Sequence, residues 1–455
     1  MRIPATIRLL PAAVVAVVLG ACSSGAGPPA FPGVQTLESP MLSLHRHASS
    51  SKIQHIVIIV QENRSFNNLF YGFPGAHTAK YGFDTNGNKI TLQPVGLETW
   101  WDVEHDLNGF LVACNGKGSL PGTDCQMNGF DREYYGCGSQ CPNNNPPYSY
   151  VPHSETKPYF FMGKHYVLAD EMYASNLDAS SFISHQYIIA GQASSAVNYP
   201  SGYYWGCPGG SSDYIATITQ QRQYGPDIAL CWDNKTLGDE MDKAGLSWAF
   251  YTSVYYGDGG IWSAYQNISH IYNGPDWGKD IITPQTNFFN DVQNGKLRAL
   301  SWITPTCENS DHAGCGSNTG PSWVASLVNA IGESKYWDST AIFIFWDDYG
   351  GWFDAKAPKM VDYDGLGMRI PMLIVSAYAK DGNINHTRFE HGTILKFVED
   401  TFGLPRLSNS DTRANSPDDA FDFNKPARKF EAVPSLRGIE YFKHQPIDRR
   451  PVDSE

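Results

Sequence analysis

Short apolar runs, largely β-branched, alternate along this chain with stretches of helical periodicity. Such runs are typical of parallel strands, because helices cover both faces of a parallel sheet and exclude water from it. The alternation predicts an α/β fold with a mostly parallel central sheet flanked by helices. The expected strands span residues 56–60, 247–251, 299–303, 341–346 and 372–376, and the expected helices span residues 181–190, 237–243, 323–331 and 391–401.

Length and composition suit one large domain or two medium ones, since 42% of the 455 residues are hydrophobic. We assign residues 52–425 to one domain and residues 426–455 to a C-terminal tail. Within the domain, residues 98–165 combine four cysteines with a Pro- and Asn-rich run at 142–147. This composition predicts a loop-rich, disulfide-stapled insertion over one end of the sheet.

The first 22 residues predict a targeting signal. Two arginines precede an apolar run at 9–21 that is too short to span a bilayer, as in a signal peptide. The run ends in Leu-Gly-Ala-Cys22, which resembles the lipobox of bacterial lipoproteins, where the cysteine is acylated. The alternative is a plain signal peptide with a chance cysteine. We expect export to the bacterial cell envelope, a lipid anchor at Cys22 in the outer membrane or at the cell surface, and a flexible tether at residues 23–51.

The other eight cysteines form an even set, which agrees with export to an oxidising compartment. Their spacing favours pairing between neighbours, although the sequence leaves other connectivities open. A zinc site is the competing interpretation, but the paired CxxC spacing of such sites is absent. The neighbouring pairs are Cys114 with Cys125, Cys137 with Cys141, Cys207 with Cys231, and Cys307 with Cys315.

Charge and missing motifs exclude several functions. The formal net charge of −13 argues against nucleic acid as a partner, and an anionic substrate would need a local cation. The chain has no GxSxG, GxxxxGK[ST] or HExxH segment and no full GxGxxG after a strand. Common serine acyl hydrolases, NTPases and simple zinc proteases are therefore disfavoured.

Acidic residues follow two of the expected strands directly. Glu62 and Asn63 end the run at 56–60, and Asp347 and Asp348 end the run at 341–346. Ligands bind at the carboxyl ends of strands in open α/β sheets. The glycines at 350–351 permit the strand break that would let both aspartates reach one ion. Each pair alone is more often a solvated turn or helix cap, but together they predict an oxygen-rich site for a divalent metal ion.

Six motifs then identify a resemblance. The chain is similar over residues 52–405 to the bacterial phosphoesterase family that contains phosphatidylcholine-preferring phospholipases C and the acid phosphatase AcpA. The resemblance implies an alkaline-phosphatase-like fold and one metal site, made here by Glu62, Asn63, Ser181, Asp347 and Asp348. The motifs are Gln61-Glu62-Asn63-Arg64-Ser65-Phe66, His105-Asp106, Met127-Asn128-Gly129-Phe130, Ser181-Phe182-Ile183-Ser184-His185, Ser310-Asp311-His312 and Trp346-Asp347-Asp348-Tyr349-Gly350-Gly351.

Ser181 is the nucleophile that the resemblance implies. It opens the expected helix 181–190, so its hydroxyl would lie in the positive field of a helix N-terminus and beside the cation. A metal can activate the hydroxyl and neutralise phosphoryl oxygens, which predicts in-line attack and a phosphoseryl intermediate. A simple N-cap role for Ser181, or a nucleophilic role for the neighbouring Ser180, remains the alternative.

The histidines divide into two groups. His105 and His312 match family positions that face the phosphate, where an imidazole can bind phosphoryl oxygen or protonate the leaving group. His270 is a third candidate, with a surface structural role as the alternative. For His185 and His391 we favour structural roles.

Together these features predict a metal-dependent phosphoric ester hydrolase of the acid phosphatase or phospholipase C type. Phosphomonoesters and phospholipids are both candidate substrates. One departure weakens the transfer of substrate preference: many family members carry Asp-His after the DDxGG segment, whereas Ala355 follows Asp354 here. The alternatives are a sulfatase or phosphotransferase on the same fold, although no CxPxR-type segment is present at Ser181, and an inactive surface-binding lipoprotein with a degenerate site.

Overall fold

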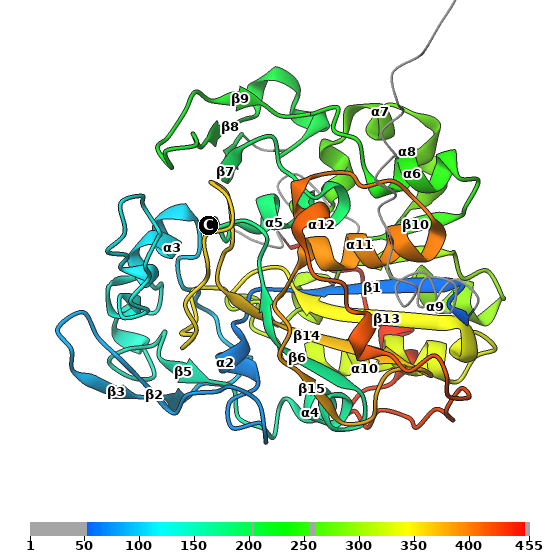
Figure 1. Ribbon diagram of the computed structural model, residues 1–455, viewed down its shortest axis with the longest axis horizontal. Helices are drawn as coiled ribbons and strands as arrows, with labels where there is room; N and C mark the ends of the chain where they lie inside the picture. Colours follow the sequence, from blue (N-terminus) through cyan, green and yellow to red (C-terminus); the bar gives the residue numbers. More distant parts are fainter. Residues whose placement is uncertain (1–51, 203, 254–259, 451–455) are drawn as a thin grey trace, which may run out of the picture.

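The computed structural model describes residues 52–202, 204–253 and 260–450. Its centre is a twisted nine-stranded sheet (Figure 1), in which β16 pairs with β6 beside β15. The expected α/β fold is confirmed. In spatial order the strands are β11 (Ile281–Ile282), β10 (Trp248–Tyr251), β12 (Leu300–Ile303), β1 (His55–Gln61), β13 (Thr340–Trp346), β14 (Arg369–Ser376), β6 (Val167–Tyr173) and β15 (Asn383–Asn385), with β16 at Phe389–Glu390.

The sheet is mostly parallel. Among the described strands, β14 runs antiparallel to both of its neighbours, β13 and β6, and the remaining pairs are parallel. All five expected strands are confirmed, because their apolar side chains fill the fully buried centre of the sheet. Strand β6 was not expected: Asp170 and Glu171 interrupt its apolar run, and a charged pair in a strand is a poor sequence signal.

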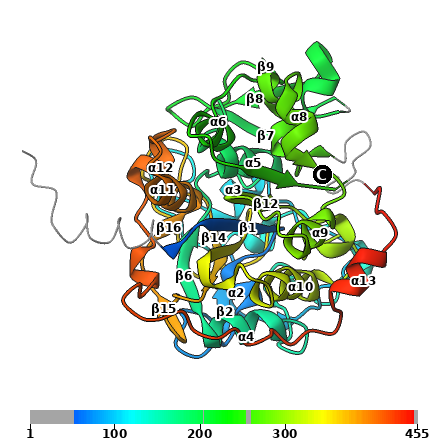
Figure 2. The ribbon, with the colours of Figure 1, turned by 90° about the vertical axis from the view of Figure 1, so that its right-hand side faces the viewer.

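Helices cover the two faces of the sheet (Figure 2). Helices α5 (Ser181–Ala190) and α11 (His391–Phe402) lie on one face, and α4 (Lys157–His165) and α10 (Gly320–Gly332) lie on the other. The four expected helices are confirmed within two or three residues at their ends. The remaining described α-helices are α2 (Phe66–Leu69), α3 (Leu107–Cys114), α6 (Leu237–Lys243), α7 (Ser269–Tyr272), α8 (Pro275–Asp280), α9 (Asn287–Gln293), α12 (Asn409–Arg413) and α13 (Ile439–His444).

Residues 98–165 contain more regular structure than expected. Helix α3 lies within this range, and the side chains of Tyr159 and Met162 on α4 belong to the main hydrophobic core. Small sheets lie outside the central one: β2 (Tyr81–Phe83) with β3 (Lys89–Thr91), β4 (Gln93–Pro94) with β5 (Ser149–Tyr150), and β7 (Ala196–Ser201) with β8 (Tyr214–Thr217) and β9 (Ile228–Ala229).

Neighbouring cysteines are paired as their spacing favoured. The four disulfides join Cys114 to Cys125, Cys137 to Cys141, Cys207 to Cys231, and Cys307 to Cys315. The first two staple the range 98–165. The competing zinc interpretation of these cysteines is therefore wrong.

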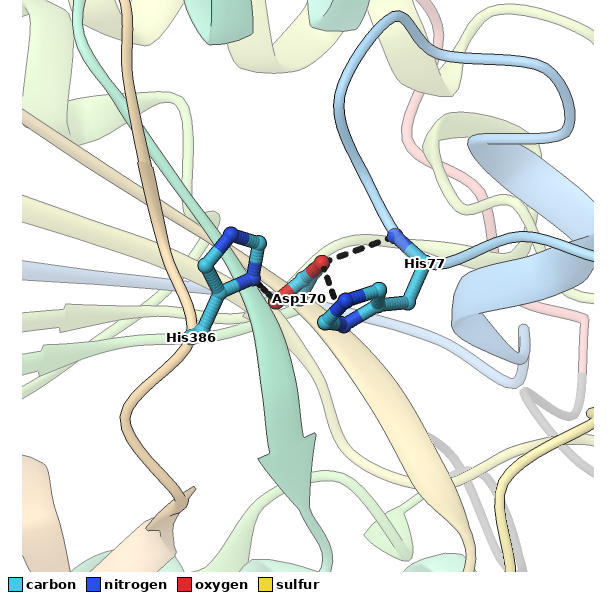
Figure 3. Close-up of side chains that lie close together, drawn as sticks. All are labelled: His77, Asp170 and His386. Carbon is cyan, nitrogen blue, oxygen red and sulfur yellow. Dashed lines mark hydrogen bonds and ion pairs between the residues drawn. The ribbon is translucent and has the colours of Figure 1, made fainter.

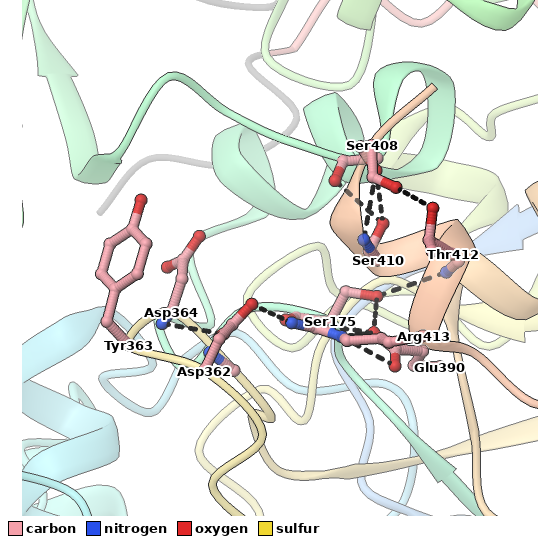
Figure 4. Close-up of polar contacts among 12 residues, drawn as sticks. Ser175, Asp362, Tyr363, Asp364, Glu390, Ser408, Ser410, Thr412 and Arg413 are labelled. Atoms are coloured by element: carbon pink, nitrogen blue, oxygen red, sulfur yellow. Dashed lines mark hydrogen bonds and ion pairs between the residues drawn. The ribbon is translucent and has the colours of Figure 1, made fainter. Parts of the chain in front are cut away.

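The C-terminal part of the chain returns over the domain. Arg413 at the end of α12 makes a bifurcated contact with Glu390 at 2.7–3.1 Å and also contacts Asp362 and the Ser175 carbonyl (Figure 4). These contacts fix α12 against α11. No helix in the described ranges combines the length and apolarity needed to cross a bilayer. The signal peptide, Cys22 and the tether lie outside the described residues.

Candidate functional site

The carboxyl ends of β1 and β13 lie side by side. The two strands are parallel neighbours with Gln61 opposite Trp346, so the residues that follow each strand meet at one edge of the sheet. The Asp347 amide donates to the Gln61 carbonyl at 3.0 Å, and the Asn63 amide donates to Asp347 Oδ1 at 3.1 Å. The two acidic motifs of the sequence therefore form one cluster.

Glycine at position 350 permits this close approach. Gly350 has φ +60°, and a Cβ there would lie 2.1 Å from the Asn63 carbonyl oxygen. Asn63 itself is left-handed, with φ 57°, a conformation that asparagine tolerates better than most residues. The Gly350 amide donates to Asp348 Oδ1 at 2.7 Å and so orients that carboxylate.

The first residue of α5 completes the cluster. Asn63 Nδ2 donates to Ser181 Oγ at 3.1 Å, and Ser181 Oγ donates to Asp348 Oδ2 at 3.4 Å. Ser180 Oγ instead donates to the Asn198 carbonyl at 2.8 Å. Of the two candidate serines, the structure brings Ser181 to the acidic residues, and Ser181 is the first residue of α5, at the positive end of the helix dipole.

A histidine outside the expected set lies between two carboxylates. His185 Nε2 is 3.2 Å from Glu62 Oε1 and 3.8 Å from Asp347 Oδ2. The sequence did carry a signal for His185, since a residue four positions after Ser181 shares its helical face. His391 also lies near Asp347, and burial lowers its pKa to about 4, the nearby carboxylate only partly opposing that effect.

The cluster fits a divalent cation. Glu62, Asn63, Ser181, Asp347 and Asp348 are all fully buried. Asn63 Oδ1 and Asp347 Oδ2 are buried and accept no hydrogen bond. A buried acceptor without a partner costs folding free energy, and a bound cation would remove that cost. Ligand atoms of Glu62, His185 and Asp347 all lie within 4.8 Å of one another. The oxygen-rich donor set, with one imidazole, is chemically suited to such an ion.

Two further histidines border the cluster. His105 Nε2 is 2.7 Å from Asn63 Nδ2 and 3.1 Å from the Tyr199 hydroxyl, while its Nδ1 faces the Val103 carbonyl at 2.7 Å. The His312 ring centroid is 5.8 Å from that of His105, and His312 Nδ1 is 3.7 Å from Asp102 Oδ2. Sequence reasoning missed Asp102 and Tyr199, for which the local sequence carries no signal.

His270 lies elsewhere. It is on α7, its side chain is 37% exposed, and its two ring nitrogens face Asp233 and Asp239 at 2.7 Å and 2.8 Å. These contacts suit a surface ion pair. The structure thus brings together every other residue expected from the sequence in the metal and catalytic set.

The comparison with protein families agrees with this geometry. The sequence pattern of the phosphoesterase family matches residues 53–405. The chain belongs to the phosphoesterase family. The matched range includes both strand-end pairs that meet in this structure, Glu62–Asn63 and Asp347–Asp348.

Known relatives of this phosphoesterase are phospholipases C. It is 25% identical to a non-hemolytic phospholipase C of Burkholderia pseudomallei, over 85% of this chain and 61% of that protein. It is also 25% identical to phospholipase C B of Mycobacterium tuberculosis, over 78% of this chain and 74% of that protein. The chain thus spans less than two thirds of the length of the Burkholderia relative.

Solved structures similar to this phosphoesterase are distant in sequence. One is an alkaline phosphatase superfamily protein from Vibrio parahaemolyticus, with 11% identity and a TM-score of 0.38 over 84% of this chain and 79% of that one. Another is the PsFucS1 sulfatase from Pseudoalteromonas sp., with 10% identity and a TM-score of 0.40 over 86% of this chain and 77% of that one.

Proposed function

We propose that this phosphoesterase hydrolyses phosphoric esters, as an acid phosphatase or phospholipase C, through a serine nucleophile and a divalent metal ion. The observation that carries the proposal is the position of Ser181 Oγ, between Asn63 Nδ2 and Asp348 Oδ2 at the N-terminus of α5. A hydroxyl held between a donor and a carboxylate, at a helix end that favours anions, suits attack on a phosphoryl group.

Each residue of the cluster has a distinct task. Asp348 accepts the hydrogen bond of Ser181 and can take its proton, while Asn63 orients the oxygen toward phosphorus. The N-terminus of α5, where Ser181 lies, would favour the negative charge of a phosphoryl group. The bond from Ser181 Oγ to phosphorus forms as the bond from phosphorus to the alcohol oxygen breaks, and water then hydrolyses the phosphoseryl group.

Glu62, Asn63, Asp347 and Asp348 would hold the cation, with His185 beside them. When bound, the cation would supply positive charge that lowers the pKa of the serine hydroxyl and neutralises phosphoryl oxygens. The four ligand residues fix the position of the cation's positive charge. His185, placed between Glu62 and Asp347, separates two like charges and orients them.

The departing alcohol needs a proton, and His105 is placed to give it once its ring is protonated. The Val103 carbonyl accepts from Nδ1, so Nε2, which faces the Asn63 Nδ2 donor as an acceptor in the neutral ring, must first take a proton from solvent before it can pass one to the alcohol. Tyr199 contacts the same nitrogen at 3.1 Å. His312 lies beside His105 and can bind a phosphoryl oxygen, with Asp102 stabilising its positive charge.

The names of the relatives favour a phospholipid substrate. Phospholipases C cleave a phosphodiester, and both relatives named above carry that name. A lipid anchor at Cys22 in the cell envelope would keep such an enzyme near its substrate. The sulfatase or phosphotransferase alternative shares the fold but lacks support from these names.

A substrate panel tests the proposal. Purified protein is assayed with p-nitrophenyl phosphate, phosphatidylcholine and p-nitrophenyl sulfate, before and after chelation and with divalent ions restored. We expect hydrolysis of at least one phosphoric ester, loss on chelation and recovery with metal. Turnover of the sulfate ester alone would replace the proposal with the sulfatase alternative, and no turnover of any ester would favour the inactive surface protein.

A further inference from the structure

A second group of metal-ligating side chains lies outside the candidate active site, around Asp170 of β6. It consists of His77, Asp170 and His386, which come from three separate segments of the chain (Figure 3). His77 is on the loop between α2 and β2, Asp170 is on β6, and His386 is on the connection between β15 and β16. We propose that these three residues bind a transition-metal cation of the zinc class, at a site distinct from the catalytic centre.

The buried carboxylate is the first observation. Asp170 is fully buried, and its side chain faces imidazole nitrogens at both oxygens. His386 Nδ1 is 2.8 Å from Oδ1, and His77 Nδ1 is 3.3 Å from Oδ2. Within the described ranges, no lysine or arginine side chain lies within ion-pair distance of this carboxylate. A buried carboxylate that faces two imidazoles is better compensated by a divalent cation held jointly by all three side chains than by the two imidazoles alone.

The geometry is the second observation. The three ligand atoms lie within 4.8 Å of one another. Ligand atoms bound at about 2.0 Å to tetrahedral zinc are separated by about 3.3 Å. The separation of His77 Nδ1 from Asp170 Oδ2, 3.3 Å, matches this spacing, and His386 Nδ1 lies 2.8 Å from the other carboxylate oxygen. The two rings flank Asp170 with centroids 4.6 Å apart and planes inclined by 34°, so both direct Nδ1 inward (Figure 3). Two imidazoles and a carboxylate favour zinc-class metals over Mg²⁺ or Ca²⁺ and leave a fourth position open for water.

The backbone holds these side chains in place. Strand β15 ends opposite Ala169 and β16 begins opposite Met172, so the connection between them passes Asp170. Asp419 anchors that connection by accepting hydrogen bonds from Asn385 at 2.8 Å and Thr387 at 3.1 Å. The His77 amide donates to Asp170 Oδ2 at 2.8 Å. The site is thus preorganised before any metal binds.

The neighbouring segments would be joined by the ion. The loop that carries His77 already packs on β15, because the Gly75 backbone lies so close to Ile384 that a Cβ would be 2.6 Å from its side chain. Glu171 Oε1 lies 3.3 Å from His77 Nδ1 but is shared with Lys356 at 2.7 Å, so it is at most a substitute ligand. A bound cation would fasten the loop and the β15–β16 connection to the edge of the central sheet.

Zinc titration of the untagged, full purified chain tests the proposal. The background is Glu62→Ala, which removes a ligand of the catalytic site, and the probe is Zn²⁺ alone. We expect about one remaining equivalent per chain and a zinc-dependent rise in Tm. Adding His77→Gln and His386→Gln should weaken that binding by at least about tenfold and abolish the rise. His165→Gln, an exposed histidine beside Glu431, is the matched control and should change neither quantity.

Several outcomes would overturn the site. Unchanged zinc affinity after both histidine substitutions would do so, as would the absence of bound zinc in the Glu62→Ala chain. The double histidine variant is not used if its circular dichroism shows that it is misfolded. In that case Co²⁺ is bound to the Glu62→Ala chain instead of zinc, and its visible absorption spectrum reports the ligands. A spectrum that shows no nitrogen ligands would contradict the proposal. Native ester hydrolysis should survive in His77→Gln, which separates failure of this site from failure of the proposed function.

Discussion

Asn63 and Ser181 are 118 positions apart in sequence, yet Asn63 Nδ2 donates a hydrogen bond to Ser181 Oγ at 3.1 Å. This bond joins the carboxyl end of β1 to the first turn of α5. Asn63 makes this bond from a left-handed backbone with φ 57°. The orientation of the candidate nucleophile therefore depends on a strained residue in a different element.

Removing the Asn63 side chain should impair turnover, and the backbone strain can be separated from that effect. We expect Asn63→Gly and Asn63→Ala each to lower kcat by about 10²-fold, as for loss of one positioned donor. The alanine variant should in addition lose about 1 kcal/mol of unfolding free energy, because only glycine adopts φ 57° without penalty. Steady-state kinetics and thermal unfolding measure the two effects. Equal stability of both variants would contradict the strain argument.

Loss of a carboxylate from the cluster should remove the catalytic ion. Asp347→Ala and Glu62→Ala each delete a fully buried ligand candidate, so we expect about one metal equivalent less per chain and little remaining turnover. Elemental analysis after gel filtration gives the content. Asp381→Ala, on an exposed side chain, controls for lost charge. Normal metal content and activity in Asp347→Ala would refute the assignment of this site.

The sequence predicts the frame of this site well because strand ends are local signals. Burial on both faces gives β1 and β13 continuous apolar runs, and the abrupt change to Glu62 and Asp347 marks where each strand has ended. That the two strands are neighbours is a long-range property. Neither run alone contains it; the structure pairs β1 with β13 in parallel.

The histidines show where local signals fail. His185 shares a helical face with Ser181, whereas His270 has no such neighbour in sequence; in the structure His270 meets two aspartates at the surface, and His185 meets the buried carboxylates of Glu62 and Asp347. Which carboxylate a histidine contacts depends on strand order and on helix placement. Strand β6 was missed for a related reason: the partners of its buried Asp170, His77 and His386, come from distant segments of the chain.

A buried carboxyl beside α12 should make stability depend on pH. Burial raises the pKa of Asp364 from 3.8 to about 7, and Arg413 only partly opposes this (Figure 4). Between these two values the folded chain holds the proton more tightly than the unfolded chain, so unfolding free energy falls as pH rises. The contribution of protonated Asp364 to the unfolding free energy is complete below pH 3.8 and is lost as the pH rises past about 7.

Asp364→Asn removes this titration. We expect the Tm of the native chain, relative to the variant, to decline from about pH 4 to about pH 7 and to change little above that. Differential scanning calorimetry at matched ionic strength measures the difference. Asp381→Asn corrects for the loss of one negative charge at an exposed position. Parallel Tm curves for native and Asp364→Asn protein would show that Asp364 ionises normally.

Anchoring is predicted from Cys22 alone. The sequence predicts that an acyl chain on Cys22 attaches the protein to the membrane, so Cys22→Ser should release the protein from membranes. Cell fractionation with a metabolic lipid label measures this, and Ser23→Ala is the control. Membrane association that persists without the label would mean that another surface of the protein binds the bilayer.

The nucleophile separates an enzyme from a binding protein. Ser181→Ala removes the hydroxyl between Asn63 and Asp348, so we expect kcat to fall by about three orders of magnitude or more, with metal content only modestly lower because the carboxylates carry the charge. Ser180→Ala is the matched control: its hydroxyl faces the Asn198 carbonyl, and turnover should change little. Acid quenching with a phosphorylated substrate, followed by peptide mass mapping, should place phosphate on Ser181. Phosphate on Ser180 would move the nucleophile by one position, and an active Ser181→Ala protein without a trapped intermediate would indicate direct attack by water.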